Sequence, residues 1–215
     1  MCSTEKHSLQ RGMYFNLHKR QNIFLMSLRP NAPYADMVED GGRTLIYEGH
    51  DEPKSDSISD PKLIDQPMYR NGNLSENGKF YNSAISYKNG KAEPIIVKVY
   101  EKIKPGMWAY NGLFKLIDSW RVNDGKRFVF KFRLSIIEQN LDIEQDNDDV
   151  PRIIPTDVKI KVWNRDKGKC VKCGSTENLH FDHIIPYSRG GSSLTEKNIQ
   201  ILCARCNIEK RDNIE

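Results

Sequence analysis

Alternating apolar and polar positions predict β-strands in the first two thirds of the chain. The run 95–100 places apolar side chains on one face, which is typical of a strand that covers a core. The run 127–136 is longer: Phe128, Phe130, Phe132, Leu134 and Ile136 form one face, and the opposite face is largely basic. Asn123-Asp124-Gly125 separates this run from 113–120 and predicts a hairpin turn. We expect the aromatic face to belong to the core and the basic face to be exposed.

Turn signals divide the rest of this region into short segments. Asn-Gly or Pro-Gly pairs occur at 71–72, 77–78, 89–90, 105–106 and 111–112, and such pairs favour tight turns. Many short strands separated by turns are typical of a barrel or a strongly curved sheet. The region 1–137 is therefore predicted to be mostly β.

The last third of the chain predicts a different arrangement. Residues 178–186 are typical of a strand, 188–193 form a loop with two glycines, and 194–202 are typical of a second short strand. The polar run that begins at Ala204 suits a short helix. The predicted order is strand, loop, strand, helix. The fold class expected for the whole chain is α+β.

Two Cys-x-x-Cys pairs frame this last third: Cys170 with Cys173, and Cys203 with Cys206. Each pair forms a tight turn that aims two thiolates at one point, and two such turns complete a tetrahedral structural zinc site. Such a site is closed, so no thiolate is left for catalysis. Free thiols or a redox-active pair are the alternative. Only Cys2 remains, so we expect no disulfides and a reducing, cytoplasmic compartment of prokaryotic type.

The distribution of charge predicts where two domains join. The net charge is +4, but the run 138–149 is acidic, as solvated linkers often are. Pro151 and Pro155 stiffen its far end. We predict domains at 1–137 and 157–215, with an acidic, proline-containing linker at 138–156. Two basic domains fit contact with nucleic acid, although ordinary solubility also explains a mild positive charge. No apolar run approaches the ~20 residues of a membrane helix, so we expect no membrane association.

A series of motifs in the C-terminal domain resembles the HNH nucleases over 158–211. They are Asp182-His183-Ile184-Ile185-Pro186, Gly190-Gly191, the run Asn-Ile-Gln-Ile-Leu-Cys from Asn198, and Cys206-Asn207-x-x-Lys210. The resemblance implies a ββα-metal fold, which here would carry the four-cysteine zinc site. It also implies hydrolysis of phosphodiester bonds in DNA.

The same resemblance assigns roles to four residues. His183 matches the general base that activates water, and Asp182 matches a ligand of one catalytic divalent metal. Asn198 matches the residue that orients the histidine and the hairpin. Asn207 lies where the family often has a histidine ligand. Because carboxylate and amide oxygens are hard ligands, the pair Asp182 and Asn207 suits Mg2+ or Mn2+.

General chemistry agrees with these roles. An imidazole with a pKa of about 6.5 suits proton abstraction near neutral pH. Adjacent strand residues point to opposite faces, so Asp182 and His183 cooperate only where the strand bends or ends. The alternative is a solvated surface pair on a plain zinc ribbon. We interpret the neighbouring His180 as structural or DNA-contacting.

A second ordered series of markers lies in the N-terminal region. Tyr34-Ala35-Asp36, Gly41-Gly42, 45–51 and Asp65-Gln66-Pro67 are followed by 71–82, 96–100 and 110–114. Together they resemble the SRA domain (SET and RING associated, also called YDG) over 11–138. SRA domains bind DNA that contains modified cytosine. The resemblance implies a PUA-like, curved β-barrel that flips the modified base into a pocket.

By this resemblance, Tyr34 and Tyr47 match the tyrosines that stack on the flipped base. Asp36 matches the carboxylate that accepts a hydrogen bond from the exocyclic amine of cytosine. Tyr34 and Asp36 are two residues apart, so on a strand they share a face. The alternatives are a core aromatic for Tyr47 and a turn or capping carboxylate for Asp36. Further candidates for shaping the pocket or a flipping loop are His50, Asp51 and Gln66.

The two resemblances together imply a restriction endonuclease. It would recognise double-stranded DNA with 5-methyl- or 5-hydroxymethylcytosine by base flipping and cut it at a single-metal HNH site. One site per chain cuts one strand, so we expect a homodimer for a double-strand break. Two alternatives stay open: a non-catalytic modified-DNA-binding protein with a zinc scaffold, and an HNH nuclease that reads another DNA feature.

Overall fold

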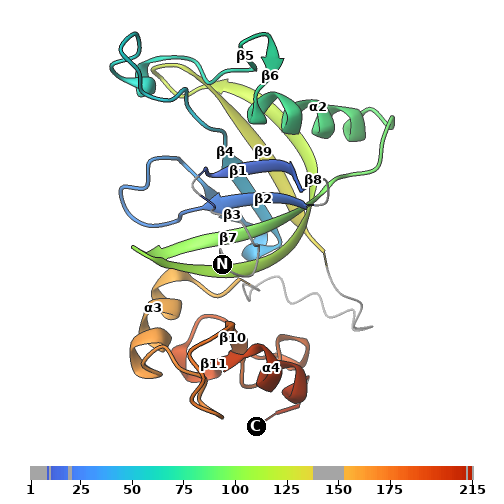
Figure 1. Ribbon diagram of the computed structural model, residues 1–215. Coiled ribbons are helices and arrows are strands. Elements are labelled where there is room, and N and C mark those ends of the chain that lie inside the picture. The colour runs from blue at the N-terminus through green and yellow to red at the C-terminus, as the bar shows by residue number, and fades with distance from the viewer. Residues whose placement is uncertain (1–8, 10, 19–20, 138–152, 212, 215) are drawn as a thin grey trace.

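Seven strands form one curved, mixed sheet in the N-terminal domain (Figure 1). The structure is a computed structural model and describes residues 9, 11–18, 21–137, 153–211 and 213–214. β2 and β7 are parallel, and every other neighbouring pair is antiparallel. The predicted β-rich N-terminal domain is confirmed. The strand order is β1 (Met13–Leu17), β2 (Gln21–Met26), β7 (Ile96–Lys104), β8 (Met107–Asn123), β9 (Phe128–Ile136), β4 (Thr44–Glu48) and β3 (Met37–Glu39).

One long strand, β8, connects the two halves of the sheet. Its 17 residues pair first with β7 and then with β9. Asn123 pairs with Phe128 across the hairpin turn that the sequence predicted. Between the partners Tyr110 and Gly112, Asn111 has no partner in β7. Because a β-bulge bends and twists a strand, Asn111-Gly112 lets β8 curve and is not the turn that was predicted.

The main core packs between the sheet and helix α2 (Glu76–Lys88). Phe80 and Ala84 of α2 are fully buried beside Phe24, Phe130 and Phe132. At about 25 cal/mol per Å² of apolar surface, burial of each such phenylalanine contributes roughly 1.5–3 kcal/mol. The aromatic face of β9 is therefore core as predicted, except for Phe128, which is 45% exposed.

The sequence analysis missed α2, because it took Asn77-Gly78 for a turn. Both residues lie in the first turn of the helix, where the Ser75 hydroxyl accepts a hydrogen bond from Gly78 N at 3.1 Å. A side chain at Gly78 would lie 2.3 Å from the carbonyl oxygen of Met68. Glycine is present here for close packing rather than for a turn, and a serine N-cap was the signal for the helix.

Two of the three cations on the basic face of the run 127–136 are buried, against the prediction, whereas the third, Arg133, keeps a side chain that is 39% exposed. Arg127 is 3% exposed and Lys131 is 9% exposed. Arg127 pairs with Asp51 at 2.5 Å, and Lys131 pairs with Glu48 at 2.8 Å. Buried charges need such partners, so these cations stabilise the domain from inside and are not available to DNA.

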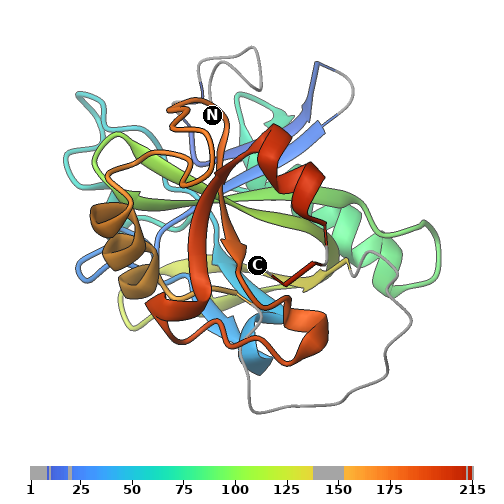
Figure 2. The same ribbon diagram turned by 90° about the horizontal axis from the view of Figure 1, so that it is seen from below.

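The C-terminal domain contains two helices and a two-stranded hairpin. Its elements are α3 (Thr156–Arg165), β10 (Leu179–His183), β11 (Ile199–Cys203) and α4 (Ala204–Lys210). The strand–loop–strand–helix order matches the sequence, and the α+β fold class is confirmed. Two differences are the added helix α3 and a 3-10 turn at Glu196–Asn198, where a strand was expected. Figure 2 shows this domain in front of the sheet, with α3 at its side.

The predicted linker falls mostly outside the described residues, which leave out 138–152 together with Cys2. Its last residues behave differently from a solvated segment. Ile153 and Ile154 are 8% and 7% exposed, and Thr156 already belongs to α3. A short hairpin, β5 (Tyr69–Arg70) with β6 (Asn73–Leu74), completes the described strands. Within the described residues, no helix is long and apolar enough to cross a membrane.

Candidate functional site

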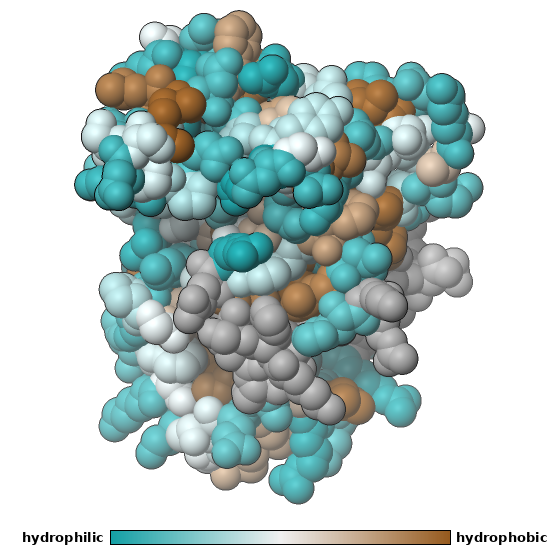
Figure 3. Space-filling view, turned by 45° about the horizontal axis from the view of Figure 1, so that its top comes forward, coloured by the Kyte–Doolittle hydropathy of each residue, from teal (hydrophilic) through white to brown (hydrophobic). Residues whose placement is uncertain are grey.

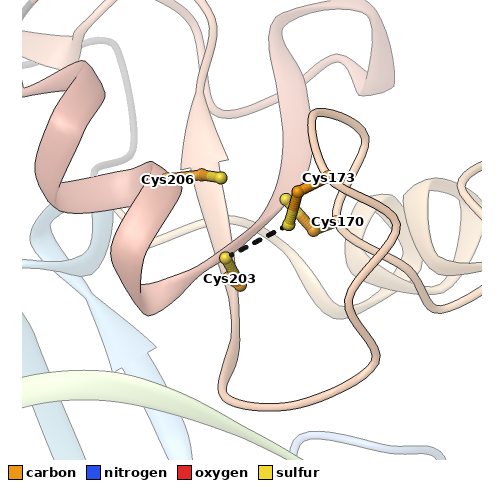
Figure 4. Close-up of side chains that lie close together, drawn as sticks. All are labelled: Cys170, Cys173, Cys203 and Cys206. Atoms are coloured by element: carbon orange, nitrogen blue, oxygen red, sulfur yellow. Dashed lines mark hydrogen bonds between the residues drawn. The ribbon is translucent and has the colours of Figure 1, made fainter.

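Four cysteine side chains converge in the C-terminal domain (Figure 4). The Sγ atoms of Cys170, Cys173, Cys203 and Cys206 all lie within 4.8 Å of one another. In a tetrahedral site with Zn–S bonds of about 2.3 Å, sulfurs lie about 3.8 Å apart. The donor set and its spacing therefore fit zinc. Among the described residues, no other group of three or more His, Cys, Asp or Glu side chains is arranged to hold a metal.

A backbone turn and a strand–helix junction direct these thiols toward one another. Cys170 N donates to Ser175 O and Gly174 N donates to Cys170 O, both at 2.8 Å. The resulting tight turn needs Gly174 at a φ of 76°, which glycine adopts without strain. The second pair lies where β11 passes into α4. The site therefore joins the loop after α3 to the hairpin and its following helix.

Asp182 and His183 are the last two residues of β10. They oppose Gln200 and Ile199 of β11, so their side chains leave opposite faces of the hairpin. The strand ends at His183, as the sequence analysis required for any cooperation. His183 Nε2 is 2.8 Å from the hydroxyl of Ser193, which is fully buried. This contact fixes one ring nitrogen and the orientation of the imidazole.

Asn198 holds the loop that follows His183. Its Oδ1 accepts from Ile185 N at 2.8 Å, and its Nδ2 donates to the carbonyl oxygens of Ile185 and Ser192, each at 3.1 Å. A side chain at Gly191 would lie 1.8 Å from Ile185 O, so this loop closes only with glycine. The amide of Asn198 thus ties both ends of the loop that carries Ser193.

Lys210 is a residue that the sequence analysis did not assign. It is 2% exposed, donates to His183 O at 2.7 Å and lies 3.1 Å from Asp182 Oδ2. The ammonium group therefore holds the end of β10 against α4. The sequence signal was present in the closing Cys-Asn-x-x-Lys run.

Asn207 lies three residues before Lys210 on α4, and residues at this spacing share a helix face. Its amide is therefore on the side of α4 that meets β10. Asp182 and Asn207 offer carboxylate and amide oxygens, which are the ligands that hard divalent cations such as Mg2+ prefer. The chemistry of this pair fits such a metal.

The N-terminal domain has a cavity of about 530 Å³. This volume lies within the range of small-molecule sites. The cavity is lined by Tyr34, His50, Asp51, Asn77 and ten further residues. Burial and the nearby Asp51 carboxylate raise the pKa of Tyr34 to about 12. The Tyr34 and His50 rings stack with their centroids 4.6 Å apart.

The neighbours of His50 fix its tautomer. The Tyr47 hydroxyl donates to Gly12 O at 2.8 Å and lies 2.7 Å from His50 Nε2. A hydroxyl has one proton to donate, so His50 Nε2 must carry its own hydrogen. Burial lowers the pKa of His50 to about 4, so the ring is neutral near pH 7. The remaining nitrogen, Nδ1, is therefore a hydrogen-bond acceptor.

The three predicted pocket residues are not placed alike. Tyr34 lines the cavity, whereas Tyr47 is 2% exposed and stacks on Phe24 at 4.1 Å inside the core. The Asp36 carboxylate accepts from the backbone N–H groups of Ser27 and Glu48, at 3.0 and 2.9 Å. Burial raises the pKa of Asp36 to about 7. Only Tyr34 of the three borders the cavity.

The other candidates divide in the same way. His50 and Asp51 line the cavity. Gln66 does not line the cavity and is only 1% exposed. Its Nε2 donates to Gly49 O at 2.6 Å, and its Oε1 accepts from Phe130 N at 2.8 Å. His180 is partly buried on β10. Exposed apolar side chains of the N-terminal domain include Leu63, Tyr69 and Phe128, and Figure 3 shows hydrophobic residues as separate patches among hydrophilic ones.

Comparison with known proteins found one family model and several solved structures that are similar to parts of the chain. Residues 170–213 match the family model described as HNH endonuclease. No curated protein matches the chain. The chain is 24% identical to the SUVH5 SRA domain solved with hemimethylated CG DNA (TM-score 0.42) and covers 81% of it with 64% of its own length. The same domain solved with fully hydroxymethylated CG DNA gives 20% identity, with the same coverage and TM-score.

A third match is SUVH6 of Arabidopsis thaliana, solved with SAM. It is 15% identical, with a TM-score of 0.38, and the match covers 80% of this chain but 25% of that one. The predicted HNH domain is confirmed over the matched residues, and SRA domains are what the N-terminal part is similar to.

Proposed function

We propose that this protein is a modification-dependent restriction endonuclease. Its C-terminal domain would hydrolyse phosphodiester bonds, and its N-terminal domain would recognise a modified cytosine in double-stranded DNA. The observation that carries the proposal is the end of β10 in the HNH-matched segment. There Asp182 and His183 lie beside a buried serine, a buried lysine and a loop that Asn198 closes.

Each of these residues has a task in the proposed hydrolysis. His183 takes a proton from the attacking water, and the Ser193 hydroxyl at Nε2 fixes the orientation of its imidazole. Asn198 keeps the imidazole in place by closing the loop that carries Ser193. Asp182 and Asn207 would hold a divalent cation, which, when bound, supplies stabilisation of the charge that develops on the phosphate. Lys210 orients the Asp182 carboxylate.

The cavity beside Tyr34 is the proposed site for a flipped base. Tyr34 lines the cavity with an aromatic ring, the kind of surface on which base-flipping proteins stack a base, and in this structure that ring contacts His50 and the Lys62 ammonium. His50 lines the cavity and its neutral ring carries one acceptor nitrogen, and cytosine carries an exocyclic amine that donates. We therefore assign recognition of the amine to His50. Tyr47 holds the His50 ring, and Asp36 anchors the Tyr34 segment to Ser27 and Glu48.

Cleavage of matched DNA duplexes tests the proposal. Three duplexes of one sequence contain cytosine, 5-methylcytosine or 5-hydroxymethylcytosine and are incubated with Mg2+ or Mn2+. We expect the wild-type protein to cut a modified duplex and His183→Ala to lose at least about 100-fold in rate, as expected for removal of a general base. Glu177→Ala, at an exposed position just before the same strand, is the control and should keep its activity.

The outcomes separate the parts of the proposal. Equal cutting of all three duplexes would keep the nuclease and reject the reading of modified cytosine. If none is cut with either metal while a modified duplex is bound, the C-terminal domain is a scaffold. If His183→Ala cuts as fast as the wild type, His183 is not the base.

Double-strand cleavage requires a second active site, since each chain offers one Asp182–His183 pair. We propose that two copies act as a homodimer on DNA. Light scattering with and without a modified duplex measures the assembly, and the ratio of nicked to linear plasmid measures the number of strands cut. A monomer on DNA that gives only nicked product would contradict the dimer.

A further inference from the structure

A closed network of buried polar side chains joins the two domains. Glu101 of β7 is fully buried, and Lys159 of α3 is 3% exposed. Lys159 Nζ lies 2.5 Å from Glu101 Oε2 and donates to Asn111 Oδ1 at 2.8 Å. Asn111 Nδ2 donates back to Glu101 Oε2 at 3.1 Å, and the Thr156 hydroxyl donates to Glu101 Oε1. Each charge has its partner in the other domain.

Apolar packing surrounds this network. Ile103, Met107 and Ala109 of the N-terminal domain form a buried cluster that the C-terminal domain covers with Ile160, Trp163 and Phe181. The Lys104 ammonium also lies 5.8 Å from the centre of the Trp163 ring. Packing that excludes water strengthens the ion pair inside it. We call these residues, together with Glu101, Asn111, Thr156 and Lys159, the docking surface.

The docking surface reaches the catalytic strand itself. Phe181 lies on β10 two residues before His183, so the two side chains leave the same face of the strand. Phe181 packs against the N-terminal domain. The position of the proposed base relative to the N-terminal sheet is therefore fixed by a contact two residues away and does not depend on the linker.

Apolar contacts with both domains also fix the segment of the chain that enters the C-terminal domain. Ile153 packs in the main core of the N-terminal domain, and its neighbour Ile154 packs in the core of the C-terminal domain. A side chain at Gly42 would lie 2.7 Å from Ile153 N, so this contact is close. Two adjacent residues thus belong to two different cores, so no flexible segment separates the domains at this point.

We propose that the docking surface sets where the nuclease cuts. Glu101, Lys159 and Phe181 are positioning residues, which hold His183 at one offset from the cavity beside Tyr34. The cut then falls at a defined distance from the modified base, although the chain between the domains is long enough to permit many distances. This inference rests on the proposed function.

Cut-site mapping on an end-labelled duplex with one modified cytosine tests the inference. The first variant has ten Gly/Ser residues inserted between 145 and 146, outside the docking surface. Lengthening a loop costs little free energy, so we expect the same cut positions as in the wild type. The second variant is Lys159→Glu, which places two carboxylates against each other. We expect its cuts to spread over several positions, and to spread further when the insertion is added.

Matched controls separate docking from folding. Lys161→Glu reverses a charge on the same helix at an exposed position, where the side chain is 57% exposed, and should keep the wild-type cut positions. Zinc content and binding to the modified duplex report whether each domain is folded. If Lys159→Glu loses either, Met107→Glu on the N-terminal side replaces it, with the same expected spread.

Two results would overturn the inference: a spread of cut positions from the insertion alone, or sharp wild-type positions in folded Lys159→Glu and Met107→Glu. Small-angle scattering gives a readout without cleavage. The wild type and the insertion variant should share one compact maximum dimension, and Lys159→Glu should be longer. If the wild type cuts no modified duplex, the proposed function fails, and scattering alone still decides whether the domains are docked.

Discussion

Single buried polar residues determine much of the local geometry in both domains. Asn77 is an example: its Oδ1 accepts from His50 N and its Nδ2 donates to His50 O, both at 2.8 Å. This pair of bonds fixes the backbone of a cavity-lining residue from helix α2. Lys210 does the same for His183 in the other domain. Such residues act on the sites through the backbone, and truncating them would leave buried groups without partners.

Asp36 gives a prediction at this scale, because burial raises its pKa from the ordinary 3.8 to about 7. Between these pH values the folded protein keeps a proton that the unfolded chain releases. The contribution of Asp36 to stability is therefore full below pH 4 and is lost as pH rises through 7. The Asp36→Asn side chain does not titrate, so only the wild type loses this stabilisation as the pH rises. The difference in unfolding free energy between the wild type and the less stable variant should therefore shrink from pH 4 to pH 7.

Urea unfolding of both proteins at each pH measures this difference, in which other titrating groups cancel. At low pH the deficit should be about 1–3 kcal/mol, the cost of an unpaired buried backbone donor. Asp56→Asn, at an exposed position, is the control and should show no pH-dependent difference. A constant deficit for Asp36→Asn would contradict the raised pKa.

At the scale of elements, the C-terminal domain depends on the cysteine cluster. The loop at 170–174, strand β11 and helix α4 meet at this cluster, and the apolar cluster around them is small. Structural zinc sites supply folding free energy directly. The order of these elements was therefore visible in the spacing of the cysteines, even though no apolar pattern marks them strongly.

Removal of zinc should unfold the C-terminal domain and spare the N-terminal one. We expect Cys203→Ser, or a strong chelator, to abolish cleavage and the protection of β10 and β11 from hydrogen exchange. Binding to a modified duplex should persist. Cys2→Ser is the matched control and should keep its metal content and activity. Retained protection of β10 in zinc-free protein would contradict the structural role.

The features that could not be predicted from the sequence share one physical cause, which is that tertiary contacts determine them. Helix α2 contains Asn77-Gly78 in its first turn, and the roles of these two residues come from tertiary contacts with His50 and Met68. The basic residues of β9 looked solvent-facing because their partners, Asp51 and Glu48, are also distant. Alternation and local turn signals predicted β9 itself to within one residue at its start. Local patterns thus predict strands, whereas tertiary contacts decide which faces are buried.

The candidate sites show the same division. Motif spacing identified the four cysteines and predicted Asp182 and His183 within a strand over 178–186, whereas the strand ends at His183. It did not identify Lys210 or Ser193, which are defined by three-dimensional contacts. In the N-terminal domain, the markers identified Tyr34, His50 and Asp51, which line the cavity. They also pointed to Tyr47 and Asp36, which do not.

At the scale of the whole molecule, the two domains share one buried boundary. Ile153 is 8% exposed in the N-terminal core. We expect Ile153→Ala to lower the free energy of unfolding by about 2–5 kcal/mol through lost burial and a cavity. Ile208→Ala, at a position that is 69% exposed, should change it by less than about 0.5 kcal/mol. Thermal unfolding with both variants measures the difference, and equal effects would contradict the shared core.

The adjacent burial of Ile153 and Ile154 in two cores has a consequence for chimaeras. Grafting this nuclease onto a foreign recognition module at the acidic run would leave Ile153 without its pocket and Lys159 without Glu101. A functional hybrid must therefore import the matching patch of β7 and β8 as well. Recombination between such enzymes would succeed more readily by exchanging loops around the cavity than by exchanging whole domains.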